Sequence, residues 1–374
     1  MCPLPLFHVF AAYPVLMSCL ASGAHLVLPT PAGYRGEGVF DNFWKLIERY
    51  RVTFLITVPT ALAALMQRPV NADISSLRVA ISGSAPLPVE LINRFRTTTG
   101  IDISEGYGLT EATCLVSCNP ASGIKKVGSV GIPFPHTEVR IFECDDHGEV
   151  LRECATEEIG EICVASPGVH EERTYTQDDK NTGLYARRVF LRTGDLGKLD
   201  SDGYLYITGR KKDLIIRGGH NIDPSEIEDA LSGHPHVAFV AAIGQPDSYA
   251  GEVPAAYVEP IAGARPDIAD LMDYAQRHIA QRAAIPKHIE LIDQLPKSAV
   301  GKVLKFELRK LAIARVFDAT FEAEGLDVRV RRVVEDRSRG LVARLEPPSA
   351  DTETTREAAA RCLGMFAIPW EWDD

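Results

Sequence analysis

The sequence predicts an α/β fold with more than one domain, and three observations indicate this. Between residues 24 and 110, continuous apolar runs alternate with amphipathic helical patterns, as expected for a parallel sheet buried on both faces. Between 127 and 208, short alternating segments with turn residues indicate a small β-barrel or sheet. After 209, helices and strands mix again. The 374 residues are enough for two or three domains.

The first part contains the elements of the predicted parallel sheet. They alternate between strand-like and helix-like runs in the order AHLVLP, FDNFWKLIERY, TFLITVP, TALAALMQ, LRVAISG, LPVELINRFRTTTG and ISEGYG. Binding sites in such sheets form beyond the carboxyl ends of the strands. Two loops follow strands in this way, at 82–86 and 106–111, and we expect them to line a site.

The apolar stretch from Leu4 to Leu28 carries no charge and is long enough to cross a membrane. Prolines, histidines, serines and a glycine interrupt it, and no basic residue precedes it as a secretory signal requires. We therefore predict a buried helix followed by a strand at 24–29, and no transmembrane segment.

Residues 194–228 contain the most informative pattern. The DSDG turn at 200–203 lies between two alternating segments, which predicts a β-hairpin over 198–207. The segment 209–213 breaks the pattern and indicates a joint between two domains. Two glycines at 218 and 219 permit positive φ and close approach of another molecule, and DPSE at 223–226 begins a helix.

The remaining segments complete the predicted organisation. PSEIEDALSGHP and DIADLMDYAQRHIAQ read as helices, with VAFVAAIGQPD and EVPAAYVEP as strands between them, in an α+β domain that ends near residue 311. A short α+β extension follows, with a hairpin around an SRG turn, a helix at 349–364 and a third strand in FAIPWEW. The predicted parts are 1–125, 126–209, 210–312 and 313–374.

Composition restricts the classes of partner. The net charge of −11 argues against nucleic acid. The eight cysteines include no CxxC, so we expect free thiols and a cytoplasmic protein. Six arginines between 329 and 344 could contact an acidic partner, but solvent-facing positions of an alternating strand are the favoured interpretation.

Three motifs together resemble one family. TGDLGKLDSDGYLYITGRKKDLIIRGGHNIDPSEIE, SEGYGLTEAT and LPKSAVGKVLKFELRK are similar to motifs of the adenylate-forming superfamily and occur in its order. The resemblance covers roughly residues 1–312. It implies a large domain with parallel sheet layers and a small β-barrel, followed by a smaller mobile domain, and an AMP-forming acid to CoA ligase that uses ATP, Mg²⁺ and coenzyme A.

The resemblance assigns nucleotide roles in the first part. It places Tyr107 against adenine, Thr110 on the AMP phosphate and Glu111 on Mg²⁺, whose preferred ligands are hard oxygens. Asp195 can accept hydrogen bonds from the ribose hydroxyls, and Arg210 adds donors to the same nucleotide. The other nucleotide-binding residues implied are Gly83, Ser84, Ala85, Pro86 and Gly108.

The resemblance also assigns roles to residues of the acyl pocket and of the mobile domain. Lys302 resembles the lysine that bridges carboxylate and α-phosphate, and Lys212 occupies the hinge position. Gly218 and Gly219 are expected to flank the pantetheine thiol, and His8 to line the acyl pocket. Taken singly, these residues are ordinary turn, cap, core or surface residues, and only the complete motifs favour the functional interpretation.

One departure affects the predicted activity. Members of the family carry, before the segment that resembles PLFH, a Ser/Thr/Gly-rich phosphate loop ending in Pro-Lys, and the 374 residues contain no such loop. We therefore expect an N-terminally shortened ligase with impaired adenylation. Its expected substrates are fatty or other apolar acids, and a homodimer is one expected assembly. The alternatives are a non-catalytic remnant and an adenylation module that loads a carrier protein.

Overall fold

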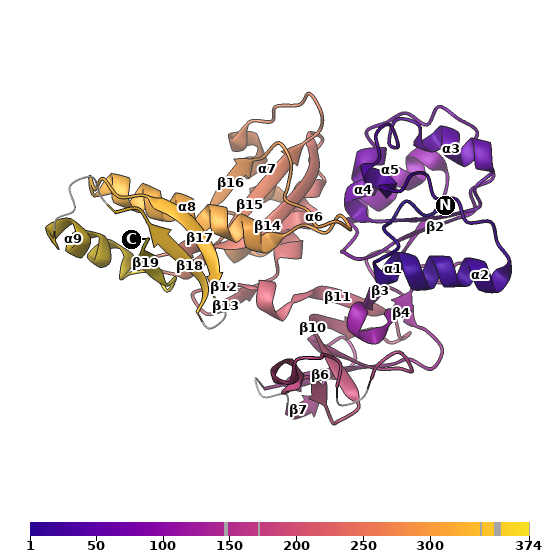
Figure 1. Cartoon of the computed structure of the whole chain (residues 1–374), viewed down its shortest axis with the longest axis horizontal. Helices are drawn as coiled ribbons and strands as arrows, with labels where there is room; N and C mark the ends of the chain where they lie inside the picture. Colours follow the sequence, from indigo (N-terminus) through magenta and orange to yellow (C-terminus); the bar gives the residue numbers. More distant parts are fainter. Residues whose placement is uncertain (146–148, 171–172, 337–338, 348–352, 374) are drawn as a thin grey trace. The chain divides into compact units, whose positions relative to one another are not determined.

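A computed structural model of the chain describes residues 1–145, 149–170, 173–336, 339–347 and 353–373 (Figure 1). The chain divides into two compact units. The first unit comprises Met1–Lys212 and Lys297–Lys302, and the second comprises Asp213–Pro296 and Val303–Asp374. The mixed α/β architecture predicted from the sequence is confirmed, and each unit is described separately below.

The first sheet of the first unit has five strands in the order β1-β2-β3-β4-β5. They are β1 (Phe54–Thr57), β2 (Val79–Ser82), β3 (Ile103–Leu109), β4 (Cys114–Cys118) and β5 (Ile132–Pro133). The pairs β1–β2 and β2–β3 are parallel, as predicted, whereas β4 and β5 add antiparallel pairs that the sequence did not reveal. The carboxyl ends of β2 and β3 therefore lie at one edge.

Three helices connect or precede these strands where the sequence predicted them. They are α3 (Phe43–Tyr50), α4 (Pro59–Leu65) and α5 (Val89–Thr99). Pro59 begins α4, where its fixed φ suits the first turn and its missing N–H costs no hydrogen bond. Gly100 ends α5 in the left-handed conformation. Buried residues of α3 and α4, such as Trp44 and Leu62, contribute to the core.

The N-terminal segment differs from its prediction. It forms α1 (Val9–Ala11), a π-helix η1 (Ala12–Met17) and α2 (Ser18–Ser22), and it is buried on one side only, since Phe7 and Leu20 are 77% and 68% exposed. The strand predicted at 24–29 is absent; the backbone of that segment is held by bonds from Ala24 N–H to the Cys19 carbonyl and from Cys2 N–H to the Val27 carbonyl. The prediction was wrong because an alternating apolar run becomes a strand only beside a continuous partner.

The second sheet of the first unit has six strands and is antiparallel. They are β6 (Glu138–Cys144), β7 (Val150–Glu153), β8 (Gly160–Ala165), β9 (Tyr185–Ala186), β10 (Phe190–Leu199) and β11 (Leu205–Arg210). The predicted hairpin is formed by β10 and β11 and is longer than expected, with register from Asp195↔Arg210 to Leu199↔Leu205. Two short 3₁₀ turns, η2 (Gly33–Arg35) and η4 (Asp178–Asn181), lie in loops of this unit. The DDHG sequence at 145–148 predicts a turn, and most of it falls outside the described residues.

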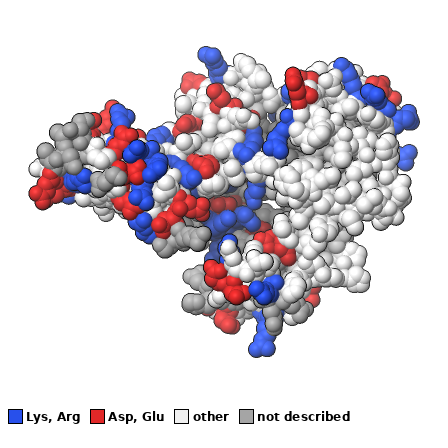
Figure 2. All heavy atoms as spheres, viewed as in Figure 1, with Lys and Arg blue, Asp and Glu red and all other residues white. Residues whose placement is uncertain are grey.

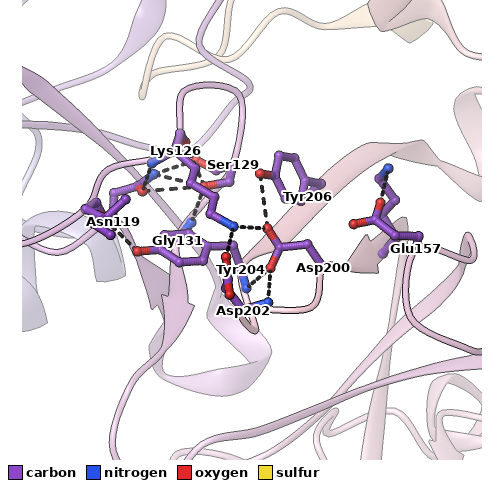
Figure 3. Close-up of polar contacts among 11 residues, drawn as sticks. Asn119, Lys126, Ser129, Gly131, Glu157, Asp200, Asp202, Tyr204 and Tyr206 are labelled. Carbon is purple, nitrogen blue, oxygen red and sulfur yellow. Dashed lines mark hydrogen bonds and ion pairs between the residues drawn. The ribbon is translucent and has the colours of Figure 1, made fainter.

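Lys126 anchors the loop 119–131 to the β10–β11 hairpin (Figure 3). Its ammonium group lies 2.5 Å from Asp200 Oδ2 and 2.7 Å from Asp202 Oδ2, and 4.6 Å from the centre of the Tyr204 ring. Asn119 holds the same loop by donating to the Ser129 carbonyl and accepting from the Lys126 N–H. These contacts connect residues 119–131 to the turn between β10 and β11.

The second unit contains a five-stranded sheet with helices. Its strands are β12 (Ile215–Arg217), β13 (His220–Ile222), β14 (Val237–Asp247), β15 (Gly251–Pro260) and β16 (His288–Leu291), in the order β13-β12-β15-β14 with β16 on β15. Its helices are α6 (Pro224–Ser232), α7 (Ile268–His278) and α8 (Lys305–Ala323), with a 3₁₀ turn η6 (Arg282–Ala284). The Asp223 carboxylate caps α6 by accepting the Ser225 N–H, as the DPSE motif predicted.

The extension folds onto the end of α8. Its sheet contains β17 (Val330–Asp336), β18 (Gly340–Leu345) and β19 (Trp370–Trp372), and α9 (Glu353–Leu363) lies between β18 and β19 in the chain. The boundary predicted at 312 falls inside α8. Leu308 and Ala312 pack in one core with Ala241 and Tyr257, whereas Phe317 and Phe321 pack in another with Leu345 and Leu363. One helix therefore belongs to both parts (Figure 1).

The arginines of the extension are mostly paired within it. Arg331 and Arg332 contact Asp373, and Arg339 and Arg344 contact Glu371. Figure 2 shows blue and red atoms mixed over this part of the chain. The pairing agrees with the interpretation as solvent-facing strand positions. Residues 337–338 of the predicted turn and 348–352 before α9 lie outside the described residues.

Two further expectations concern cysteines and membranes. All eight cysteines lie in the described part of the chain and are free thiols, as predicted. None of the helices in the described residues has the length and hydrophobicity that crossing a bilayer requires.

Replacing Lys126 by Met is expected to lower the urea midpoint of the first unit, because the largely buried Asp200 carboxylate loses its cation. Urea unfolding followed by tyrosine fluorescence or circular dichroism measures this. The neighbouring Lys125→Met removes an equal charge without breaking these contacts and is expected to leave the midpoint unchanged. Equal midpoints for the two variants would contradict the role assigned to Lys126.

Candidate functional site

Asp195 is the centre of the candidate site in the first unit. It is 6% exposed and lies in β10, beside a register shift between Arg192 and Leu196. Its Oδ2 accepts a hydrogen bond from the Tyr107 hydroxyl at 2.5 Å, and its Oδ1 lies 2.5 Å from Arg210 Nε. Burial and the neighbouring Asp195 raise the pKa of Tyr107 well above its usual value, so the phenol keeps its proton. The structure thus joins three residues that the motifs singled out.

A buried ion pair supports the turn that carries Asp195. Arg192 Nη2 lies 2.7 Å from Glu161 Oε2, and both side chains are about nine-tenths buried, with 11% and 6% exposed. Glu161 Oε1 also accepts the Gly194 N–H at 3.3 Å, and the Thr193 hydroxyl accepts the Asp195 N–H at 3.1 Å. The backbone on the N-terminal side of Asp195 is therefore fixed by side chains of β8 and β10.

The loop after β2 contains the predicted residues Gly83, Ser84, Ala85 and Pro86. A Cβ on Gly83 would lie 2.9 Å from the Phe10 ring and 3.1 Å from the Gly106 carbonyl, so the start of the loop after β2 packs closely against β3 there. Ser84 has φ of 73°, the left-handed region. The buried Glu105 carboxylate accepts the Leu87 N–H at 3.0 Å and fixes the far end of the loop.

The segment after β3 places Thr110 and Glu111 in the 3₁₀ turn η3 (Thr110–Ala112). A Cβ on Gly108 would lie 1.5 Å from the Cys114 carbonyl, so only glycine fits between β3 and β4. Glu111 Oε1 accepts a hydrogen bond from the Tyr175 hydroxyl at 2.5 Å. Burial raises the pKa of Tyr175 to about 12, and the bond to Glu111 adds to the shift, so this phenol is the donor.

His8 has a local structural contact. Its Nδ1 accepts the Phe10 N–H at 3.2 Å and caps α1. Burial lowers the pKa of His8, which favours the neutral ring that this acceptor role requires. Its role in an acyl pocket stays a prediction.

The other predicted residues lie near the division between units. Lys212 is in η5 (Lys211–Asp213) and is the residue at which the chain passes from the first unit to the second. Lys302 ends the short segment Lys297–Lys302, which also belongs to the first unit. The Lys302 N–H donates to Ser298 Oγ at 3.2 Å. Gly218 and Gly219 form the turn between β12 and β13 with φ of 54° and 84°, and a Cβ would meet no atom within 4 Å at either. The hinge, thiol and phosphate roles of these residues stay predictions.

Sequence reasoning missed several supporting residues. Tyr175 donates to the predicted residue Glu111, and Glu105 and Glu161 bond Leu87 and Gly194, which are next to predicted residues, yet these three were not singled out. The signal for the two glutamates was available, because an acidic residue inside an apolar strand is expected to be paired when buried. Tyr175 gave no such signal, since 64 residues separate it from Glu111.

Comparison with known proteins agrees with the motifs. The family model of the AMP-binding enzyme matches residues 1–172, and that of the AMP-binding enzyme C-terminal domain matches 226–302. The marinolic acid–CoA ligase of Pseudoalteromonas sp. (strain SANK 73390) is 40% identical over 366 residues, 97% of this chain and 55% of that protein. The chain belongs to the adenylate-forming superfamily.

Other members of the adenylate-forming superfamily extend the comparison. The long-chain-fatty-acid–CoA ligase of Bacillus subtilis (strain 168) is 36% identical over 308 residues, 81% of this chain and 52% of that protein. The anthranilate CoA ligase AuaEII in complex with anthranoyl-AMP has a TM-score of 0.75 at 30% identity, over 83% of this chain and 59% of that one. ATP-bound MatB from Rhodopseudomonas palustris has a TM-score of 0.72 at 31% identity, over 82% and 58%. The chain thus spans little more than half the length of these relatives.

Glu161→Gln is expected to destabilise this adenylate-forming chain by about 3 kcal/mol, because it leaves the buried Arg192 guanidinium without its anion. Urea unfolding measures the change. Glu157→Gln, which removes the exposed partner of Lys198, is the control and is expected to have little effect. A double variant with Arg192→Met should lose less than the sum of the single losses, and strict additivity would contradict direct pairing.

Proposed function

We propose that the chain forms most of the nucleotide and thioester machinery of an AMP-forming acid–CoA ligase. In this reaction a carboxylate attacks the α-phosphate of ATP, pyrophosphate leaves, and the CoA thiol then displaces AMP from the acyl-adenylate. The observation that supports this best is the hydrogen-bonded cluster of Asp195, Tyr107 and Arg210 in a member of the adenylate-forming superfamily. The segment 107–111 connects it to Glu111.

Each residue of the cluster has a chemical role in this proposal. The Asp195 carboxylate is held by a phenol and a guanidinium, and a carboxylate has further lone pairs with which it accepts the ribose hydroxyls. Arg210 neutralises Asp195 and brings a guanidinium group to the nucleotide. Tyr107 packs against adenine, between Gly108 and the loop 83–86. Thr110 donates its hydroxyl to the α-phosphate.

Glu111 fits a magnesium ion that arrives with the phosphates. Within the described residues no cluster of three or more His, Cys, Asp or Glu could hold a metal alone. Mg²⁺ in phosphate-transfer sites commonly uses one or two carboxylates, with substrate phosphates and water supplying the other ligands. One glutamate at this loop is therefore a sufficient donor set. The ion would neutralise charge on the phosphate oxygens.

The remaining predicted residues act in the two half-reactions. Lys302 brings a positive charge to the carboxylate and α-phosphate during adenylation. Lys212 marks the hinge about which the second unit turns. Gly218 and Gly219 leave room beside the pantetheine thiol, since no side chain projects from their turn. His8 lines the acyl pocket.

The proposed substrates are fatty or other apolar acids. The relatives include a marinolic acid–CoA ligase, a long-chain-fatty-acid–CoA ligase and a feruloyl-CoA synthase. The match to the marinolic acid ligase takes in 97% of the chain and must therefore include most of 313–374. Because the 374 residues hold no Ser/Thr/Gly-rich loop ending in Pro-Lys, we expect weak ATP-dependent adenylation by this chain alone.

Two alternatives differ in measurable ways. A non-catalytic remnant would bind nucleotide without forming thioester from preformed acyl-adenylate and CoA. A module that loads a carrier protein would transfer the acyl group to a phosphopantetheinyl carrier, and mass analysis with CoA and carrier in competition distinguishes the acceptors. Homodimer formation and a cytoplasmic location also stay predictions, and sedimentation velocity tests the first.

Asp195→Ala is expected to weaken AMP binding by about 10- to 100-fold, because the ribose loses a charged acceptor worth roughly 1.5–3 kcal/mol. Isothermal titration calorimetry with AMP and no divalent metal measures this. Asp200→Ala removes a carboxylate of the same sheet at the hairpin turn and serves as the control. If wild-type protein binds no AMP, or both variants bind it equally, the proposed nucleotide site is wrong.

Lys302→Ala and Gly219→Val are expected to impair different half-reactions. Lys302→Ala should lower the weak pyrophosphate exchange of the chain to background while leaving thioester formation from preformed acyl-adenylate intact. Gly219→Val should slow the thioester step by at least about tenfold, as the side chain fills the thiol approach. Gly263→Val, at a φ of 82° with the same open space, controls for backbone strain. Thioester formation that ignores Gly219 would contradict its assignment.

A further inference from the structure

Tyr175 lies outside every motif that identified the superfamily, yet it contacts the glutamate that the proposed function assigns to magnesium. Its hydroxyl donates to Glu111 Oε1 at 2.5 Å. Within the described residues no other hydrogen bond or ion pair to the Glu111 side chain is present. A single phenol therefore sets the orientation of this carboxylate, whose other oxygen is left for a ligand.

The backbone of Tyr175 is fixed by one side chain. Asn181 Oδ1 accepts the Tyr175 N–H at 2.8 Å, and Asn181 Nδ2 donates to the Tyr175 carbonyl at 2.8 Å. The same nitrogen also donates to the Gln177 carbonyl at 3.1 Å. Because the amide contacts both polar groups of the residue, the direction in which the phenol leaves the backbone is defined. Asn181 is the last residue of η4.

The loop that carries Tyr175 is also attached to the turn that carries Glu111. The Thr113 hydroxyl donates to the Gly168 carbonyl at 2.7 Å. A Cβ on Gly168 would lie 2.6 Å from the Ala112 carbonyl, so the backbones approach too closely for any other residue. The loop is therefore held against the residues that follow Glu111 at Gly168, in addition to the Tyr175–Glu111 bond.

We propose that Tyr175 is a positioning residue that orients Glu111 so that its Oε2 faces the phosphate-bound magnesium ion. The inference rests on the proposed function, because it needs Glu111 as the metal ligand. Carboxylates that ligate metals are commonly held by a hydrogen bond to their other oxygen, and loss of such a partner weakens metal binding by about 10- to 100-fold. A neutral donor suits this role, since it fixes the carboxylate without cancelling the charge that attracts the cation.

The opposite reading is that Tyr175 occupies Glu111 only while no metal is bound and must leave before the ion enters. The two readings predict opposite signs for the effect of removing the hydroxyl. If Tyr175 orients Glu111, its loss weakens metal binding; if Tyr175 competes with the metal, its loss strengthens metal binding. The two hydrogen bonds from Asn181 to the Tyr175 backbone and the attachment of the loop at Gly168 favour orientation.

The test compares Tyr175→Phe with wild type in the complete 374-residue chain. The probe is Mn²⁺, titrated into protein saturated with a non-hydrolysable ATP analogue and followed by electron paramagnetic resonance. We expect Mn²⁺ affinity to fall by about tenfold. Affinity for AMP measured in EDTA should stay within a factor of two, because the ring and the nucleoside contacts are retained.

Tyr185→Phe is the matched control. Tyr185 lies in β9, and its hydroxyl contacts the loop that carries Tyr175, through Thr174 and the His170 carbonyl, with no described contact to Glu111. We expect this variant to bind Mn²⁺ as wild type does. Asn181→Ala, which frees the Tyr175 backbone, should weaken Mn²⁺ binding in the same direction as Tyr175→Phe.

The outcomes separate the two proposals. If wild type binds AMP and Mn²⁺, but Tyr175→Phe binds Mn²⁺ equally well or more tightly, the positioning role is wrong and the proposed function stands. If Tyr185→Phe loses as much Mn²⁺ affinity as Tyr175→Phe, the effect belongs to the loop in general and the specific role is also wrong. If wild type binds neither nucleotide nor Mn²⁺, both proposals fail.

Discussion

The pairing of the buried Asp195 carboxylate is the constraint on which the site depends. A carboxylate that is 6% exposed is strongly unfavourable unless its charge and lone pairs are satisfied. Here Tyr107 comes from β3, Asp195 from β10 and Arg210 from the end of β11, so satisfying one charge brings three strands of two sheets together. The positions of these three side chains in the proposed nucleotide site therefore follow from the need to pair the buried Asp195 charge within the first unit.

Buried carboxylates also support the segments around Asp195. Glu105, Glu161 and Asp195 are buried, and all three lie in or next to the segments of the candidate site. Glu105 accepts the Leu87 N–H and Glu161 accepts the Gly194 N–H, so each fixes backbone that an ordinary loop would leave to water. The first unit thus holds its loops with charged side chains that are themselves held by their neighbours.

The sequence predicted most of the fold because hydrophobic periodicity is a local property. The runs at 54–57 and 79–82 and the helix at 43–50 carry their own pattern, and they form as expected. The segment 24–29 carries a similar pattern but lacks a continuous strand partner, which no local signal reveals. Of the site, the motifs singled out Asp195, Arg210 and Tyr107, which the structure brings together, while their nucleotide roles stay predictions. Tyr175 could not be found because its contact joins two segments far apart in the chain.

The continuity of α8 has a consequence for how motion in this chain could be observed. Its first turns are buried against β14 and β15 and its last turns against the extension, and all belong to the second unit. A 19-residue helix spans roughly 28 Å and resists bending, so the extension behaves as a lever arm attached to that unit. A fluorophore on α9 would therefore move together with β14 and β15 and report on the motion of the whole second unit.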